Sequence, residues 1–328
     1  MKNYILLLCL LFLLTGCAPA PAEAAEQTAA VTEIPAAETA MPTEAPTEAP
    51  APPPTEAPAI PTGVVLEPEA PGEAETRCEV AVVDHSNTKD GYIMVQYFGE
   101  TDKRLKVLLK GPTTTYKYDL PQGQWAVLPL SNGDGHYQAG VYRNTAGNKY
   151  ALVMTADFSV IMEDPFEPFL RPNQFVNYMN APNTVALGAQ LCAGLEDTLE
   201  KVAVIYDHVV ETLTYDAEKA ATVQSGYLPV PDEILASGKG ICFDYAAVMT
   251  SMLRSQGIPS KLVVGYAGST YHAWISVWVE EIGWIYGAIY FDGQVWKRMD
   301  PTFADTAENQ AEILDYIENG NYTEKYFY

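Results

Sequence analysis

The chain has 328 residues, of which 42 are acidic and 19 are Lys or Arg, and its formal net charge is −23. Eleven glutamates before residue 77, together with Lys2, account for −10 of this charge, and residues 77–328 carry the remaining −13. Because phosphate backbones are bound by clustered Lys and Arg, this balance argues against a nucleic acid as partner.

The first 17 residues predict export. One Lys precedes an unbroken apolar run from Tyr4 to Leu14, which at ~1.5 Å per residue covers about half of a ~30 Å hydrocarbon core. Residues 1–17 are therefore typical of a signal peptide and not of a membrane span. The end of the run, Leu-Thr-Gly-Cys, resembles the lipobox of bacterial lipoproteins. This resemblance implies that Cys17 is lipidated and anchors the protein to the membrane at the cell surface. The alternative is an ordinary secretory signal that is cleaved among the nearby small residues.

Residues 18–77 predict a disordered tether. They are mainly Ala, Pro, Glu and Thr, and the sequence Pro-Thr-Glu-Ala begins at Pro42, Pro46 and Pro54. Such a segment has too little apolar surface to offset the entropy that is lost on folding. We expect it to hold the folded part away from the membrane.

Residues 78–164 predict a small β-sandwich of the immunoglobulin-like kind. Short apolar or aromatic runs recur every 8–12 residues with turn sequences such as "NTKDG" and "SNGDG" between them, which is the pattern of an all-β domain. The predicted strands are Val80–Val83, Tyr92–Phe98, Leu105–Leu109, Thr114–Leu120, Trp125–Leu130, Tyr137–Tyr142 and Tyr150–Ile161.

Residues 165–328 predict an α+β domain. Four prolines between Pro165 and Pro182 interrupt the strand pattern, and we place the domain boundary there. Apolar residues from Leu195 to Leu213 then repeat at steps of four and three, as on one face of a helix. A second helix begins at Cys242 and ends before Gly257. Three strands follow, at Lys261–Tyr266, His272–Val279 and Val295–Met299.

Three residues in this domain have the chemistry of a catalytic triad. Cys242 is placed at a helix N-terminus, where unpaired backbone N–H groups favour a thiolate. His272 begins an alternating strand and can project toward that helix end. Asp300 follows the next strand and can accept the second ring N–H of the imidazole. A nucleophile, a base and a group that orients the base are therefore all available.

These residues lie in segments that resemble the transglutaminase-like superfamily. The segments are "GKGICFDYAAVMTSMLRSQGIPSKLVVGY", "YHAWISVWV" and "WKRMDPT", and the resemblance covers about residues 183–310. It implies a papain-like core in which a helix packs on an antiparallel sheet. It also implies Cys242 as nucleophile, His272 as general base and acid, and Asp300 as the residue that orients His272.

The resemblance further implies a thioester intermediate that forms on an amide carbonyl without a cofactor, and water or an amine would resolve it. The backbone N–H of Cys242 would hold the oxyanion, together with a side-chain donor for which Gln224 and Tyr227 are the candidates. A peptide or a cell-wall peptide is the expected substrate. Whether the enzyme is a protease, an amidase or a cross-linking transferase is left open by the sequence.

Other readings of the sequence remain. No metal site is predicted, because four His residues are present without a Cys-x-x-Cys or His-Glu-x-x-His spacing. Cys78 and Cys192 would be the pair to form a disulfide if Cys242 is free. The main alternative to an enzyme is a non-catalytic surface module that keeps the fold and binds peptide or cell wall. The sequence does not determine the oligomeric state.

Overall fold

The protein is described here by a computed structural model that covers residues 63–267, 270–280, 283–285, 289–291, 296–298 and 322–328. All of these residues belong to one compact unit, Glu56–Tyr328. Within these ranges, no helix combines the length and the apolar character that crossing a membrane requires.

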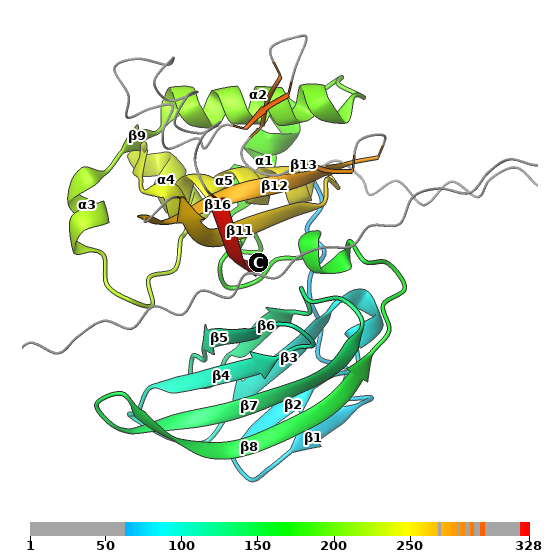
Figure 1. Cartoon of the computed structure of the whole chain (residues 1–328), viewed down its shortest axis with the longest axis vertical. Coiled ribbons are helices and arrows are strands. Elements are labelled where there is room, and N and C mark those ends of the chain that lie inside the picture. The colour runs from blue at the N-terminus through cyan, green and yellow to red at the C-terminus, as the bar shows by residue number, and fades with distance from the viewer. Residues whose placement is uncertain (1–62, 268–269, 281–282, 286–288, 292–295, 299–321) are drawn as a thin grey trace, which may run out of the picture. The chain divides into compact units, whose positions relative to one another are not determined.

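The first part of this unit is the predicted β-sandwich (Figure 1). One antiparallel sheet has the strand order β1-β2-β3-β6 and the other has the order β5-β4-β7-β8. All seven predicted strands are confirmed, and β1 is an additional one. The bounds are β1 (Glu75–Arg77), β2 (Ala81–Asp84), β3 (Tyr92–Tyr97), β4 (Leu105–Lys110), β5 (Thr115–Asp119), β6 (Trp125–Pro129), β7 (Gly135–Ala146) and β8 (Lys149–Val160).

Alternation of apolar and polar residues determines which face of each strand is buried. In β5, Tyr116 and Tyr118 are buried while Lys117 between them is exposed. In β4, the residues opposite the two tyrosines, Leu109 and Val107, are buried as well. A period of two therefore gives an inner face that fills the sandwich and an outer face that carries charged side chains.

Residues 63–77, which we name the N-terminal arm, were expected to belong to the disordered tether, and the structure differs. The backbone N–H of Gly63 donates to the Ser255 carbonyl over 2.7 Å, and that of Gly72 donates to Asp84 over 2.7 Å. Between them, the Glu69 carbonyl accepts a hydrogen bond from the Asn87 amide. These polar contacts, which composition does not reveal, mean that the ordered chain begins before Cys78.

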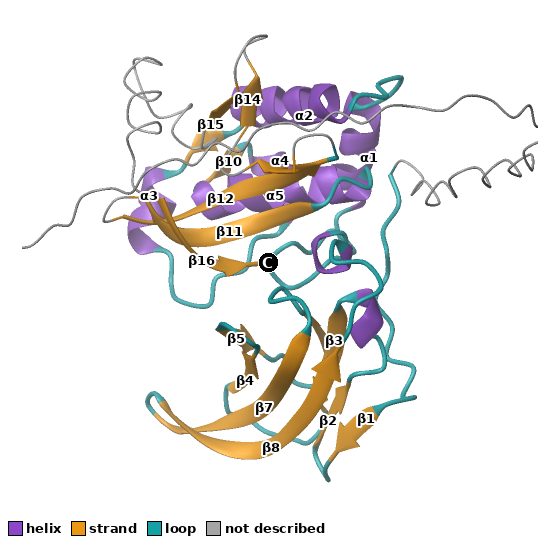
Figure 2. Cartoon of the chain, turned by 45° about the vertical axis from the view of Figure 1, so that its right-hand side comes forward, coloured by secondary structure: helices purple, strands orange, loops and turns teal. Residues whose placement is uncertain are grey.

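In its described residues the second part contains five α-helices and a four-stranded sheet, which confirms the predicted α+β class (Figure 2). The helix predicted from Leu195 to Leu213 is confirmed as α2, and the one predicted from Cys242 is confirmed as α5. The helix bounds are α1 (Pro182–Leu191), α2 (Thr198–Thr212), α3 (Ala217–Thr222), α4 (Pro231–Ser237) and α5 (Cys242–Ser255), with 3₁₀ turns at Thr88–Asp90 and Glu167–Phe169.

Helix α5 is the central element of this part. Every residue from Asp244 to Ser255 is buried, because α1, α2 and α4 contact it as well as the sheet strands β11 (Ser260–Ala267) and β12 (Thr270–Val279). The segment "YAAVM" is apolar on every face, as is typical of a helix that is buried all round, while the buried charged residues Asp244 and Arg254 have hydrogen-bond partners. The helix is followed by Gly257, whose φ of 75° lies in the left-handed region that stops a helix.

The sheet next to α5 has the order β13-β12-β11-β16, where β13 is Gly283–Ile285 and β16 is Tyr322–Phe327. A separate ribbon pairs β14 (Ile289–Phe291) with β15 (Trp296–Arg298), and a two-residue parallel pair joins β9 (Thr214–Tyr215) to β10 (Lys239–Gly240). The strand predicted before Asp300 therefore exists, but it pairs with β14 and not with the main sheet.

Arg254, near the end of α5, connects several segments from a buried position. Its guanidinium donates to the carbonyls of Ser260, Arg171 and Tyr328 at 2.6 to 2.9 Å. Burial lowers the pKa of Arg254 to about 10, so the side chain is still charged at neutral pH. A planar fork of five N–H donors can satisfy several carbonyls at once, and this explains why an arginine is tolerated in the core.

Asp232 at the start of α4 is expected to stabilise the protein by holding the start of α1. Its carboxylate accepts hydrogen bonds from the backbone and side chain of Asn183 and of Thr184, at 2.7 to 3.1 Å. Partial burial opposes ionisation, but the hydrogen bonds outweigh it and lower the pKa of Asp232. We expect Asp232→Ala to cost about 1 kcal/mol of unfolding free energy at pH 7.

The pH dependence of this effect has a defined sign. The folded pKa lies below the unfolded value of about 3.9, so the contribution is present above that pH and is lost as the pH falls through the folded pKa. Urea unfolding of wild type and Asp232→Ala at pH 7 and at pH 3 measures it. An equal difference at both values would contradict an ionic cap.

Candidate active site

Cys242 is the first residue of α5, directly after Ile241, and it is partly exposed. The two glycines before it have separate roles. Gly238 ends α4 with a φ of 64°, in the left-handed region. At Gly240, a Cβ atom would lie 2.7 Å from the Cβ of Asp244, so only glycine fits against the first turn of α5. The sequence "GKG" therefore stops one helix and gives the next one room to begin at the cysteine.

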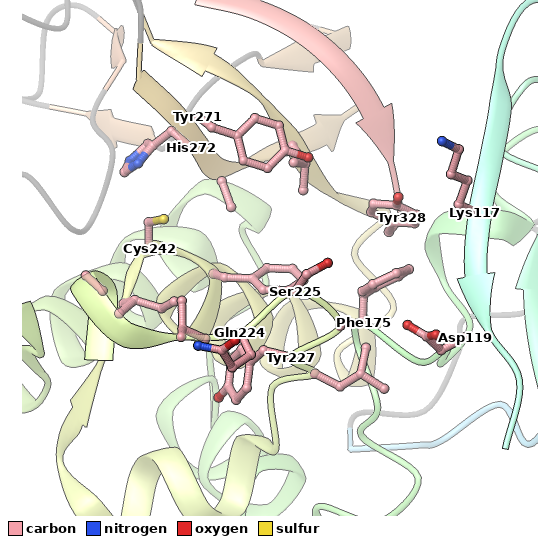
Figure 3. Close-up of a pocket in the computed structure, with 18 of the residues that line it drawn as sticks. Lys117, Asp119, Phe175, Gln224, Ser225, Tyr227, Cys242, Tyr271, His272 and Tyr328 are labelled. Atoms are coloured by element: carbon pink, nitrogen blue, oxygen red, sulfur yellow. The ribbon is translucent and has the colours of Figure 1, made fainter. Parts of the chain in front are cut away.

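His272 faces the same space from the sheet. It lies in β12 opposite Gly265 of β11, and only 7% of its surface is exposed. Both His272 and Cys242 line one cavity of about 650 Å³, in which Figure 3 shows the imidazole and the sulfur toward the same end. The structure thus brings together two of the three residues that the sequence predicted. The third, Asp300, lies outside the described residues, as does Cys17.

A buried polar network lies beneath Cys242. The Asp244 carboxylate, which is fully buried, accepts hydrogen bonds from the backbone N–H of Ile241 over 2.8 Å, from Lys219 over 2.6 Å and from the Tyr227 hydroxyl over 2.6 Å. A carboxylate in the first turn of a helix is stabilised by the partial positive charge of the helix N-terminus. Lys219 forms an ion pair with this carboxylate and balances its negative charge.

The two oxyanion candidates line the cavity, but both have other hydrogen-bond partners. The Tyr227 hydroxyl donates to Asp244. Burial is the main cause that raises the pKa of Tyr227 far above its usual value, and the hydrogen bond to Asp244 raises it further. In Figure 3 its ring points away from Cys242. The Gln224 amide donates to the Thr222 carbonyl over 2.8 Å. Both side chains therefore donate hydrogen bonds elsewhere, and the backbone N–H at the start of α5 is the donor that the helix itself supplies.

The sandwich also contributes to this cavity. Lys106, Lys117 and Asp119 of β4 and β5 line it, together with Tyr328 of the second part. The Asp119 carboxylate lies 3.3 Å from where a Cβ of Gly226 would be, so the loop after α3 reaches the sandwich.

The sequence gives a partial signal for Asp244, because the Asp in "CFDY" is an acidic residue in the first turn of a helix. Its partners Lys219 and Tyr227, like the sandwich residues of the cavity, come close only in the folded chain.

The cysteines in the described part of the chain are not paired. Cys78, Cys192 and Cys242 are all free thiols, so the possible Cys78–Cys192 disulfide is absent. Burial raises the pKa of Cys192. Cys192 is buried, whereas Cys78 and Cys242 are partly exposed. Of these three cysteines, only Cys242 begins a helix.

Known proteins resemble the second part of the chain. Residues 185–301 match the model of the transglutaminase-like superfamily. A protein-glutamine gamma-glutamyltransferase of Pseudomonas aeruginosa is 32% identical over 89 residues, or 23% of this chain, and protein YebA of Bacillus subtilis is 24% identical over 132 residues, or 33% of it. The matched stretches cover 13% and 18% of these two relatives.

Among solved structures, a proposed cysteine protease from Cytophaga hutchinsonii aligns with 64% of this chain and 78% of its own length, at 14% identity and a TM-score of 0.33. The family match covers α1 to α5 and the sheet strands β11 and β12, and it includes both Cys242 and His272. Residues 185–301 of this chain therefore form a domain of the transglutaminase-like superfamily.

Proposed function

We propose that the protein is a cysteine hydrolase or acyltransferase that acts on peptide amide bonds through Cys242, His272 and Asp300. The observation that carries this proposal is that Cys242, at the start of α5, and His272, from β12, line one cavity. The unpaired backbone N–H groups at a helix N-terminus can bind a negative charge that develops there. The family match supports the same chemistry.

The reaction follows from the roles of these residues. The Cys242 sulfur attacks the amide carbonyl, and the C–N bond breaks as His272 gives its proton to the leaving amine. The thioester is then resolved by water or by an amine, which loses a proton to His272. The backbone N–H groups at the start of α5 stabilise the oxyanion, and Asp300 orients the imidazole.

The experiment that tests this function is detection of the acyl-enzyme. The purified chain is incubated with a pool of cell-wall peptides and glutamine-containing peptides, and intact mass spectrometry follows adducts. We expect an adduct on wild type and on Cys78→Ala, whose thiol is also partly exposed, but not on Cys242→Ala. Faster loss of the adduct with added amine identifies a transferase.

The opposite result has a clear meaning. If no peptide gives an adduct or turnover and the peptides still bind, the protein is the non-catalytic surface module considered from the sequence.

We also propose that the protein is exported and lipid-anchored through Cys17. The support is the short apolar run that ends in Leu-Thr-Gly-Cys. Labelling of cells with a palmitate analogue is expected to mark the wild-type protein and not Cys17→Ala, because the lipid is attached to that sulfur. Cys9→Ala, which changes a cysteine inside the apolar run, is the matched control and should be labelled like wild type. Equal labelling of Cys17→Ala and wild type would contradict the anchor.

A further inference from the structure

The catalytic cavity extends from Cys242 and His272 to charged residues on the outer face of the sandwich. The cavity is lined by Lys106 of β4 and by Lys117 and Asp119 of β5. In the strand register, Lys106 lies opposite Asp119 and Lys117 lies opposite Leu108, so both lysines are on one face. In the view of Figure 3, Tyr271 and Tyr328 lie between the Cys242 end and Lys117.

The charges on this wall do not cancel. Lys106 and Asp119 form a salt bridge of 2.6 Å, which uses one cation and one anion. No acidic side chain among the described residues forms a salt bridge with Lys117, which is exposed. Among the described residues, no other Lys, Arg, Asp or Glu lines the cavity. Counted over the described residues, Lys117 therefore gives the cavity one positive charge without a salt-bridge partner, in a chain whose overall charge is strongly negative.

We propose that Lys117 binds a carboxylate of the substrate, so that the enzyme selects acidic peptides. An ammonium is a single point charge with three donors, which suits one carboxylate. A carboxylate can come from an Asp or Glu side chain or from a peptide C-terminus. The sandwich would then be part of the substrate site and not only a spacer, and the carboxylate would lie at the opposite end of the cavity from the amide that reacts. This inference rests on the proposed function for the reaction, but not for the binding.

Two peptide series test the proposal. Each is an acetylated, amidated hexapeptide of Ala, Gly and one Gln, in which a single Asp, or in the second series a single Lys, is placed at each position in turn. Turnover is measured with the full chain, and binding is measured by calorimetry with the Cys242→Ala full chain. A further peptide without Asp, which ends in a free C-terminal carboxylate, distinguishes an acidic side chain from a peptide C-terminus as the source of the carboxylate.

We expect one Asp position to give a kcat/KM about fivefold above the matching Lys peptide, which is the upper end of the range for an exposed charge pair. Lys117→Met should remove this preference, and Lys117→Glu should reverse it in favour of the Lys peptide. Lys149→Glu is the matched control, since Lys149 is an exposed lysine in β8, at the other edge of the same sheet. The control should keep the Asp preference, and reversal of the preference cannot result from misfolding.

The outcomes separate this inference from the proposed function. Turnover without an Asp preference in wild type, or with one that survives Lys117→Glu, overturns the carboxylate site and leaves the reaction standing. Binding to Cys242→Ala that prefers Asp peptides and depends on Lys117, without any turnover by wild type, supports the site and contradicts the reaction.

Discussion

Replacement of His272 by Gln is expected to lower kcat/KM by about 10³-fold, the middle of the range for loss of a general acid–base group. Gln can fill part of the space of the imidazole but cannot take up or release a proton near neutral pH. The thiolate would form less readily, and the leaving amine would depart without a proton. The measurement is turnover of the peptide that gives the Cys242 adduct, at enzyme concentrations high enough to detect a slow variant.

A matched control is available in the sandwich. His136 in β7 is exposed and lies 3.5 Å from Asp157, and His136→Gln should retain wild-type turnover. If His272→Gln retained it too while Cys242→Ala lost it, another group would have to serve as the base. Thermal unfolding of the variant separates lost chemistry from lost structure, because His272 is buried.

Replacement of Asp244 by Ala is expected to lower the free energy of unfolding by about 3 kcal/mol, the lower end for breaking a buried charge pair. The fully buried carboxylate accepts three hydrogen bonds, and its removal leaves the Ile241 N–H and the Tyr227 hydroxyl without their acceptor. Lys219 keeps 27% of its side-chain surface exposed and can turn toward water, which limits the loss. Urea unfolding at neutral pH measures the change.

Two further variants test the physical reason. The exposed pair of Lys103 and Asp102 has a similar distance of 2.9 Å, and Asp102→Ala should leave stability unchanged because water solvates both charges. Lys219→Met leaves the Asp244 charge buried without its cation and should also destabilise. The combination Lys219→Met with Asp244→Asn should cost less than the sum of the single changes. Strict additivity would show that the network is not coupled.

The position of Asp244 in this hydrogen-bond network also connects the stability of the protein to its activity. Asp244 holds the Ile241 N–H at the start of the helix whose first residue is Cys242. A frayed first turn would move the sulfur and the backbone N–H groups that would hold the oxyanion. We therefore expect Asp244→Ala to reduce turnover even at temperatures where the protein remains folded.

Local sequence determined much of this protein. Alternation with a period of two located the sandwich strands, and turn residues separated them. Gly257 marked the end of α5, and "GKG" marked its beginning at Cys242. These features depend on residues within a few positions of each other, where backbone propensity and side-chain periodicity act. Cys242 and His272 were assigned to one site by the resemblance to the transglutaminase-like superfamily and not by local pattern, and both line one cavity.

Tertiary structure alone decided the rest, because the determining contacts join residues far apart in the chain. The N-terminal arm looks disordered by composition, yet Gly63 bonds to Ser255 and Gly72 to Asp84. Asp244 acquires its partners from Lys219 and Tyr227, and the strand before Asp300 pairs with β14 rather than with β12. By its place in the alternating pattern of β5, Lys117 is an ordinary exposed residue. Only the packing of the sandwich beside α5 and β12 brings its charge into the cavity that Cys242 lines. Periodicity records which face of an element is buried, but it carries no information about which distant element will meet that face.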